Sequence, residues 1–273
     1  MENTSIKAMF FDLDGTLLNS ERKIPLSAVK ALNECKIKGI KLFIATARPV
    51  SLFNTLEISK EEKDLFDGGL FCNGAVISVN SSQECYFIPN EAVKKAVEVM
   101  KAFKTIRITL QKANNEHISN IPFSKEDHKI WGTDETKTFS IDGRYNDIVK
   151  ILISDGDFVN YLNPLPTDLI NTISIECGKL AKVYITDNGC IVQIVNEHIS
   201  KYAGIERIRN KLKLSKDEIA VFGDDFNDIE MLSNYKNSVA MANGSEEVKR
   251  FAGFVTKSND DDGIAYGIKH ILS

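Results

Sequence analysis

Short apolar runs alternate with amphipathic segments in the first part of the chain. The runs at 8–11 and 40–46 predict buried strands, and the residues between them place apolar side chains at helical spacing. A strand, a helix and a second strand of these lengths predict a right-handed crossover and a parallel sheet. We expect a helix near 50–64 and a strand with a turn over 69–79 to continue this unit.

The pattern changes in the middle of the chain. The polar stretch 79–84 is typical of a linker, and Asn90 is expected to cap a helix with an apolar stripe. Residues 106–111 alternate strictly, 148–153 form another apolar run, and 182–195 predict a hairpin. The middle third therefore indicates an α+β layer with antiparallel strands.

Parallel α/β patterning returns near the end, with strands expected at 219–223, 238–243 and 254–258 before a final helix. The chain has 273 residues, which suits roughly two domains at about 150 residues each. We therefore predict an α/β protein of two domains. A Rossmann-like parallel-sheet core comprises residues 1–83 and 191–273, and an inserted α+β domain comprises residues 84–190.

Composition narrows the function classes. The net charge is −4 and the pI about 5.7, so no basic surface favours nucleic acid or an anionic membrane. No apolar run approaches the ~20 residues of a membrane span. The five cysteines form no CxxC pair, which argues against a disulfide framework or a zinc site. With a polar N-terminal segment, these features predict a cytoplasmic protein.

Three predicted parallel strands end in polar side chains. They are Asp12, Asp14 and Thr16 in the first segment, Thr46 and Arg48 in the second, and Asp224, Asp225, Asn227 and Asp228 in the third. Ligands bind beyond the carboxyl ends of parallel strands, so we expect these segments to converge. Carboxylates so close together need a cation, and an all-oxygen set favours Mg²⁺, the usual partner of phosphate.

The first segment also suggests a reaction. Asp12 and Asp14 are two residues apart in an extended exit, so their side chains point the same way. One carboxylate could attack phosphorus while the other handles the proton of the leaving group. Gly15 permits the turn, and we expect the Thr16 hydroxyl to bond within it. Taken singly, each of these residues is more typical of a turn, a helix cap or a solvated surface. The prediction of a phosphoryl-transfer site rests on their occurring together at the ends of the predicted strands.

These motifs resemble those of the haloacid dehalogenase superfamily. The resemblance rests on DLDGT at 12–16, T-x-R at 46–48, a lysine at 201 and GDDFND at 223–228. FCNGAVI, VAMANGSEEVK and DDDGIAYGI are further similar to strings of Cof-type phosphatases of class IIB. The insert resembles the larger, C2B type of cap domain in that superfamily.

The resemblance implies roles for the carboxylates. Asp12 would be the nucleophile and a Mg²⁺ ligand. Asp14 would be the general acid and base and would give the metal its backbone carbonyl. Asp224 would be the third protein contact to Mg²⁺, and Asp228 would support the metal shell. An aspartate at position 14 implies a phosphatase or a phosphomutase.

The resemblance also implies a phosphate-binding set. Lys201 would offset charge on the phosphoryl group and on the nucleophile, and Thr46, Arg48 and Asn227 would bind phosphate. One departure is Tyr202, where the family usually has glycine: its ring could reshape the pocket or point outward. Two milder departures are Ala47 in place of a glycine and the order Met-Ala-Asn-Gly at 241–244.

The predicted function is a Mg²⁺-dependent phosphatase that hydrolyses a small phosphorylated metabolite through an aspartyl phosphate. Family frequency favours sugar phosphates, while nucleotides, flavin mononucleotide and pyridoxal phosphate stay open. Specificity is expected in the cap, but the sequence does not predict which of its side chains, Arg107, Trp131 and Arg144 among them, face the crevice. A phosphomutase or a catalytically weak, phosphometabolite-binding regulatory protein stays open. The only partner expected is the small-molecule phosphate ester, and the oligomeric state is not predicted.

Overall fold

In the computed structural model the chain forms two compact units. The described residues are 6–80, 82–143, 145–155 and 163–273. The first unit, here called the core, comprises Met1–Ala47, Leu56–Gln83 and Ser200–Ser273, and the second, here called the cap, comprises Arg48–Thr55 and Glu84–Ile199.

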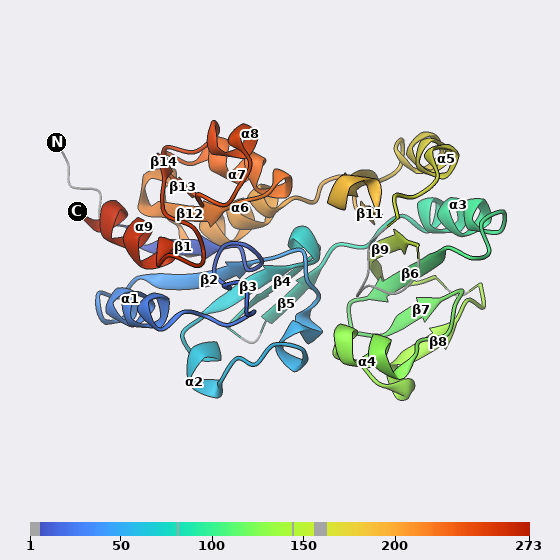
Figure 1. Ribbon diagram of the computed structural model, residues 1–273, viewed down its shortest axis with the longest axis horizontal. Coiled ribbons are helices and arrows are strands. Elements are labelled where there is room, and N and C mark those ends of the chain that lie inside the picture. The colour runs from blue at the N-terminus through green and yellow to red at the C-terminus, as the bar shows by residue number, and fades with distance from the viewer. Residues whose placement is uncertain (1–5, 81, 144, 156–162) are drawn as a thin grey trace. The chain divides into compact units, whose positions relative to one another are not determined.

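The core is built on an eight-stranded sheet in the order β14-β13-β12-β1-β2-β3-β4-β5 (Figure 1). Neighbouring strands from β14 to β3 are parallel, and β4 is antiparallel to β3. The strands are β1 (Ala8–Phe11), β2 (Lys41–Ala45), β3 (Gly68–Phe71), β4 (Val76–Val79), β5 (Ser82–Cys85), β12 (Ile219–Gly223), β13 (Asn237–Ala240) and β14 (Phe254–Val255). The predicted α/β class with a parallel sheet is confirmed.

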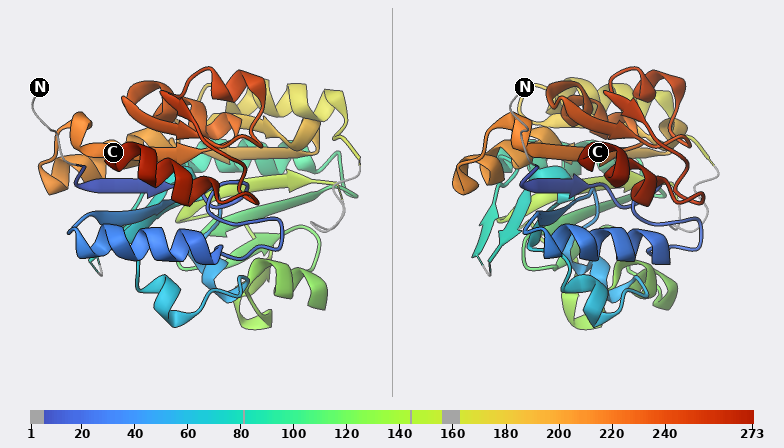
Figure 2. Two further views of the ribbon diagram at one scale, coloured as in Figure 1. Left: turned by 60° about the vertical axis from the view of Figure 1, so that its left-hand side comes forward. Right: turned by 90° about the vertical axis from the view of Figure 1, so that its left-hand side faces the viewer.

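Helices cover both faces of the core sheet (Figures 1 and 2). They are α1 (Leu26–Ile37), α2 (Lys60–Lys63), α6 (Lys201–Leu212), α7 (Ile229–Asn234), α8 (Glu246–Lys249) and α9 (Gly263–Leu272). Gly267 of α9 packs on Phe222, and Gly204 of α6 packs on Leu70. The strand pairings from β12 through β1 and β2 to β3 place Phe222 and Gly69 in one row of the sheet. Because successive residues of a strand point to opposite faces, Leu70, next to Gly69, lies on the other face from Phe222. The glycines let each helix approach its face closely.

The cap contains a six-stranded sheet in the order β10-β11-β9-β6-β7-β8. All neighbours are antiparallel except β7 and β8, which are parallel. The elements are α3 (Asn90–Met100), β6 (Arg107–Lys112), β7 (His117–Ser119), α4 (Lys125–Trp131), β8 (Thr138–Ser140), β9 (Ile148–Ser154), α5 (Thr167–Cys177), β10 (Lys182–Thr186) and β11 (Ile191–Val195). Helices α3 and α5 pack with one face of this sheet in a single apolar cluster.

One sequence prediction before residue 90 is wrong, and a second is only partly right. The expected helix at 50–64 is replaced by a 3₁₀ turn at Val50–Asn54 and by α2. Ser59 and Glu62 form a reciprocal capping box that starts α2 as a new helix. The polar stretch 79–84 was expected to be a linker: the boundary between the two units does fall within it, after Gln83, but Ser82–Cys85 form the edge strand β5.

Two boundaries also differ. Asn90 does not cap α3 but is its first residue, after Pro89, and its side chain bonds Asn146 instead. The expected insert limit at 190 would cut the hairpin of β10 and β11, whose strands are paired along their whole length. The cap accordingly continues to Ile199. No helix within the described ranges has both the length and the apolar character needed to cross a membrane.

Candidate active site

The end of β1 places Asp12 at the carboxyl edge of the core sheet. Its backbone N–H continues the ladder by donating to the carbonyl of Phe222 at 3.0 Å, and its side chain is buried. The chain then turns through Gly15, whose φ is +74°. A Cβ there would come within 2.2 Å of Asp224 Oδ2, so glycine is required both by the turn and by the approach of β12.

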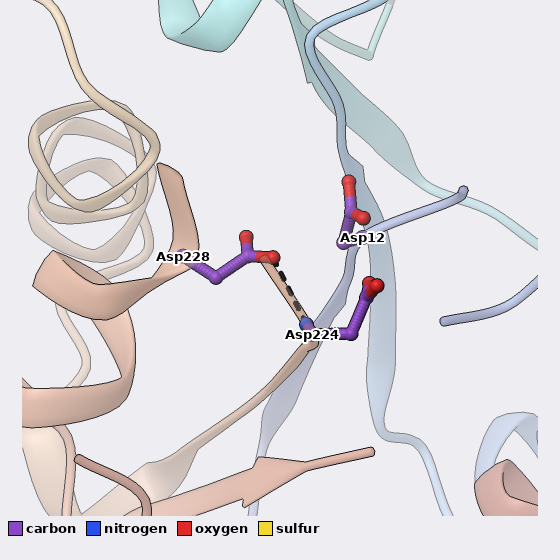
Figure 3. Close-up of side chains that lie close together, drawn as sticks. All are labelled: Asp12, Asp224 and Asp228. Carbon is purple, nitrogen blue, oxygen red and sulfur yellow. Dashed lines mark hydrogen bonds between the residues drawn. The ribbon is translucent and has the colours of Figure 1, made fainter. Parts of the chain in front are cut away.

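The end of β12 supplies the second group of carboxylates. Asp224 follows the strand directly, and the short turn at Phe226–Asp228 brings Asp228 back toward it. Asp228 Oδ2 accepts the backbone N–H groups of Asp224 and Asp225, each at 3.1 Å. Figure 3 shows Asp12 and Asp224 near each other, with Asp228 turned toward the backbone of Asp224.

Lys201 joins the two groups. It is the first residue of α6, which the Ser200 hydroxyl caps by accepting the Ala203 N–H at 3.1 Å. The Lys201 ammonium donates to Asp12 Oδ1 and to Asp228 Oδ1, each at 2.7 Å. The lysine is only 1% exposed, so a single buried cation stands among three aspartates.

The electrostatics of this site are dominated by burial. Burial raises the pKa of Asp12 well above its usual value, Lys201 opposes this, and Asp228 and Asp224 add to it. Burial also raises the pKa of Asp224 to about 7, although the hydrogen bond from Thr16 opposes the shift. For Lys201, burial alone would lower the pKa, but the attraction of Asp12 and Asp228 overcomes it and raises the pKa. The protein alone therefore leaves the negative charge undercompensated.

The donor set fits a hard divalent cation. Among the described residues, one group of metal-type side chains is found: Asp12, Asp224 and Asp228, with oxygens within 4.8 Å of one another. Asp228 already accepts Lys201 and two backbone amides, so Asp12 and Asp224 are the carboxylates better placed to bind. All-oxygen ligation suits Mg²⁺.

Five predicted site residues are not among these three aspartates: Lys201, Asn227, Asp14, Thr46 and Arg48. The Asp14 side chain is exposed, and its backbone forms a short bridge with Leu18. Thr46 is buried directly after β2, where its backbone bonds Leu70 and Asn73. Arg48 begins the segment that clusters with the cap. Their proposed roles stay predictions.

Two of the side chains considered for specificity are engaged by the cap itself. Arg107 pairs with Asp127 of α4, with Arg107 Nη1 at 2.7 Å from Asp127 Oδ1. The ring of Trp131 meets the His117 ring edge to face, with centroids 5.1 Å apart. Arg144 lies outside the described residues.

Two side-chain hydrogen bonds near Asp224 differ from the sequence predictions: the partner of Thr16 was predicted wrongly, and the bond of Asn243 was not predicted. The Thr16 hydroxyl does not bond within its own turn as expected, because it donates to Asp224 Oδ1 at 2.6 Å. The Asn243 amide donates to the backbone carbonyl of Gly15 at 2.8 Å. Asn243 stands in the string VAMANG, which served the family resemblance but received no role.

Asn73 was also missed. Its side-chain oxygen accepts the amide of Asn227 at 3.2 Å, while Asn227 Oδ1 lies 3.4 Å from Lys201 Nζ. Asn73 is buried and has a φ of 58°. The available signal was the Asn-Gly pair in FCNGAVI, since asparagine tolerates positive φ.

Tyr202 makes its recorded contacts away from the carboxylates. Its hydroxyl accepts a hydrogen bond from Lys216 Nζ at 2.8 Å, and its ring meets Tyr235 edge to face, with centroids 5.9 Å apart. Successive residues of a helix point about 100° apart, so Lys201 and Tyr202 face different surroundings. Of the two alternatives left open, these contacts favour the outward one.

Comparisons with known proteins agree with this architecture. The family of haloacid dehalogenase-like hydrolases matches residues 9–268. An Arabidopsis thaliana protein named chloroplastic endoribonuclease YBEY is 27% identical over 95% of this chain, but the chain spans 45% of that protein. A 5-amino-6-(5-phospho-D-ribitylamino)uracil phosphatase, YcsE of Bacillus subtilis, is 26% identical to this chain. The alignment covers 98% of this chain and 97% of that protein. The solved structure of a HAD subclass IIB sugar phosphatase superposes with a TM-score of 0.77 at 24% identity, over 97% of this chain and 98% of that chain.

Proposed function

This chain belongs to the haloacid dehalogenase-like hydrolase family, and within it we propose a Mg²⁺-dependent phosphatase that acts on small phosphorylated metabolites, sugar phosphates foremost. The predicted Cof-type resemblance and the phosphatase class are confirmed by the family match and by relatives named as phosphatases. The metal, the sugar-phosphate preference and the reaction steps are the proposal. The observation that carries it is the buried group of Asp12, Asp224 and Lys201.

In the proposed reaction, the Asp12 carboxylate attacks phosphorus, and Asp14 gives a proton to the leaving oxygen. Water that Asp14 activates then hydrolyses the aspartyl phosphate and frees Asp12. Mg²⁺, when held by Asp12 and Asp224, supplies positive charge that stabilises the transferring phosphoryl group. Lys201 favours the ionised form of the nucleophile, against the effect of burial, and offsets the charge that develops on the phosphoryl oxygens.

The test is phosphate release from p-nitrophenyl phosphate and a panel of sugar phosphates, with Mg²⁺ or with EDTA. We expect Mg²⁺-dependent release that Asp12→Asn lowers by about a thousandfold or more, because the nucleophile is lost. Asp217→Asn is the matched control, since Asp217 is an exposed aspartate. Tight binding of a phosphate ester by the folded, Mg²⁺-loaded protein without release would instead favour a binding protein. Turnover that requires a bisphosphate activator would favour a mutase.

A further inference from the structure

Three consecutive residues between β3 and β4 have left-handed backbone conformations. The φ angles are 52° at Cys72, 58° at Asn73 and 96° at Gly74. Glycine and asparagine tolerate such values, but cysteine adopts them rarely, so this turn is conformationally unfavourable. Backbone of this kind is concentrated at functional sites, where the surrounding contacts hold it in place. The contacts of this turn therefore indicate what it positions.

The backbone of the turn is fixed on two sides. A Cβ on Gly74 would lie 2.7 Å from the carbonyl oxygen of Ser200, the residue before Lys201, so the turn packs directly on the beginning of α6. The Asn73 N–H donates to the carbonyl of Thr46 at 3.0 Å. Asn73 is therefore held between the end of β2 and the first residue of the helix that carries the buried lysine.

The Asn73 side chain continues from this fixed backbone into the site. It is 2% exposed, and its oxygen accepts an N–H of the Asn227 amide at 3.2 Å. Because Asn227 gives its amide nitrogen to Asn73, its own oxygen faces the Lys201 ammonium, 3.4 Å from Nζ. An amide turned by half a rotation would instead present its N–H groups to the ammonium, donor against donor. The contact with Asn73 therefore selects the orientation of Asn227.

The orientation of Asn227 bears on the Lys201 ammonium, which has three N–H donors. Two of them meet the carboxylates of Asp12 and Asp228, each at 2.7 Å. The third direction, toward Asn227, has the longer distance of 3.4 Å and ends at a neutral oxygen. A neutral acceptor binds an ammonium less strongly than a carboxylate does. This third donor is accordingly the one most easily transferred to a phosphoryl oxygen.

We infer that Asn73 is a positioning residue for phosphoryl transfer, which orients Asn227 and, through it, the Lys201 donor that meets the phosphoryl group. The role of that donor rests on the proposed function. The contact between Asn73 and Asn227 does not depend on it. The two parts are therefore tested by different measurements on the same variants.

A double-mutant cycle tests the role in phosphoryl transfer, by phosphate release from p-nitrophenyl phosphate with Mg²⁺. Asn73→Gly removes the amide and keeps a residue that tolerates a positive φ. It should lower kcat/KM about tenfold in the wild-type background, because small displacements of active-site groups are costly. In the Asn227→Ala background it should change kcat/KM by less than about twofold, since the group through which Asn73 acts is gone.

The matched control is Asn188→Gly in the cap. Asn188 is exposed, has a φ of 54° and precedes Gly189 at 84°, much as Asn73 precedes Gly74. The control should leave kcat/KM within about twofold of the wild type. If Asn73→Gly is not folded under the assay conditions, Asn73→Ser takes its place, because a serine hydroxyl reaches less far than the amide oxygen.

Urea denaturation of the four proteins of the cycle tests the contact without turnover. Asn73→Gly should lower the denaturation midpoint more in the wild-type background than in Asn227→Ala, because only the first change breaks the hydrogen bond between the two side chains. Equal shifts in both backgrounds would overturn the inference.

The kinetic result can overturn it as well. If Asn73→Gly leaves kcat/KM unchanged, or lowers it equally in both backgrounds, Asn73 only shapes the turn. If the wild type releases no phosphate, the proposed function fails, and the denaturation cycle still decides whether Asn73 holds Asn227.

Discussion

The core and the cap each bury a cluster of polar side chains, and the two clusters differ in how far the hydrogen-bonding groups are satisfied within the protein. In the core, Lys201 bonds both Asp12 and Asp228. In the cap, Thr109 and His117 present atoms without partners among the described residues. A buried charge is too costly to stand alone, whereas a neutral hydroxyl or imidazole costs much less. A buried charge must therefore pair internally, whereas a neutral group can stand without a partner at a smaller cost.

The largest expected effect tests the internal pairing of the core. Lys201→Met leaves two buried aspartates without their cation, which should lower the free energy of unfolding by about 3–5 kcal/mol. Urea denaturation measures this change. Lys94→Met, at an exposed helical lysine, is the control and should stay within about 0.5 kcal/mol. A loss below about 1 kcal/mol for Lys201→Met would mean that the aspartates do not depend on this lysine.

The next effect concerns the charge that Lys201 leaves undercompensated. Mg²⁺ at a hundredfold excess over its dissociation constant should stabilise the protein by about 2.7 kcal/mol, through mass action on the folded state. Thermal unfolding with and without Mg²⁺ measures it. Asp224→Asn should remove most of this response, and Thr109→Val in the cap should keep it. An equal response in Asp224→Asn and the wild type would place the cation elsewhere.

The third effect is a pH dependence that arises in the cap. The pKa of His117 is lowered by burial to about 4 in the folded protein, from about 6.5 in an unfolded chain. Between these values the unfolded state binds more protons, so the stability due to His117 is complete above about pH 6.5 and is lost as the pH falls toward 4. From pH 7 to pH 5 the loss is about 2 kcal/mol.

The measurement is urea denaturation of the wild type and His117→Phe at both pH values. The variant should lose about 2 kcal/mol less stability on acidification than the wild type. His198→Gln is the control, because His198 is exposed. If His117→Phe loses as much stability as the wild type, the imidazole is not kept neutral by the fold.

The same contrast explains how much the sequence could predict. Asp12 and Asp224 were predictable because each directly follows an apolar strand, and parallel strands end at one edge of the sheet. Thr16 and Asn73 acquire their partners from residues 208 and 154 positions away. No local pattern encodes such a pairing. Each side chain can also be explained locally without any function, Thr16 as a hydroxyl within a turn and Asn73 as a turn asparagine.

The cap was less predictable for a second reason. Strict alternation over 106–111 predicted a half-exposed strand, but the polar side chains of Arg107, Thr109 and Gln111 are buried. Alternation of apolar and polar residues along a strand indicates that its two faces differ. It does not indicate that the polar face is exposed to bulk water. Only the register with β7 and the position of α4 reveal that this face is enclosed.

The smallest expected effect lies beside the core site. Tyr202→Phe removes the hydroxyl that accepts the Lys216 hydrogen bond and keeps the ring against Tyr235, so it should cost about 0.5–1 kcal/mol of stability. Phosphate release should be unchanged, because the recorded contacts of Tyr202 lie with Lys216 and Tyr235 rather than with the aspartates. Tyr202→Gly, which restores the residue usual in the family, should cost more, since it also removes the ring and adds a glycine within α6. Urea denaturation and phosphate release are measured in parallel, to decide whether Tyr202 points outward or reshapes the pocket. A change in the rate of phosphate release by Tyr202→Phe without a matching loss of stability would show that this tyrosine contacts the reacting groups.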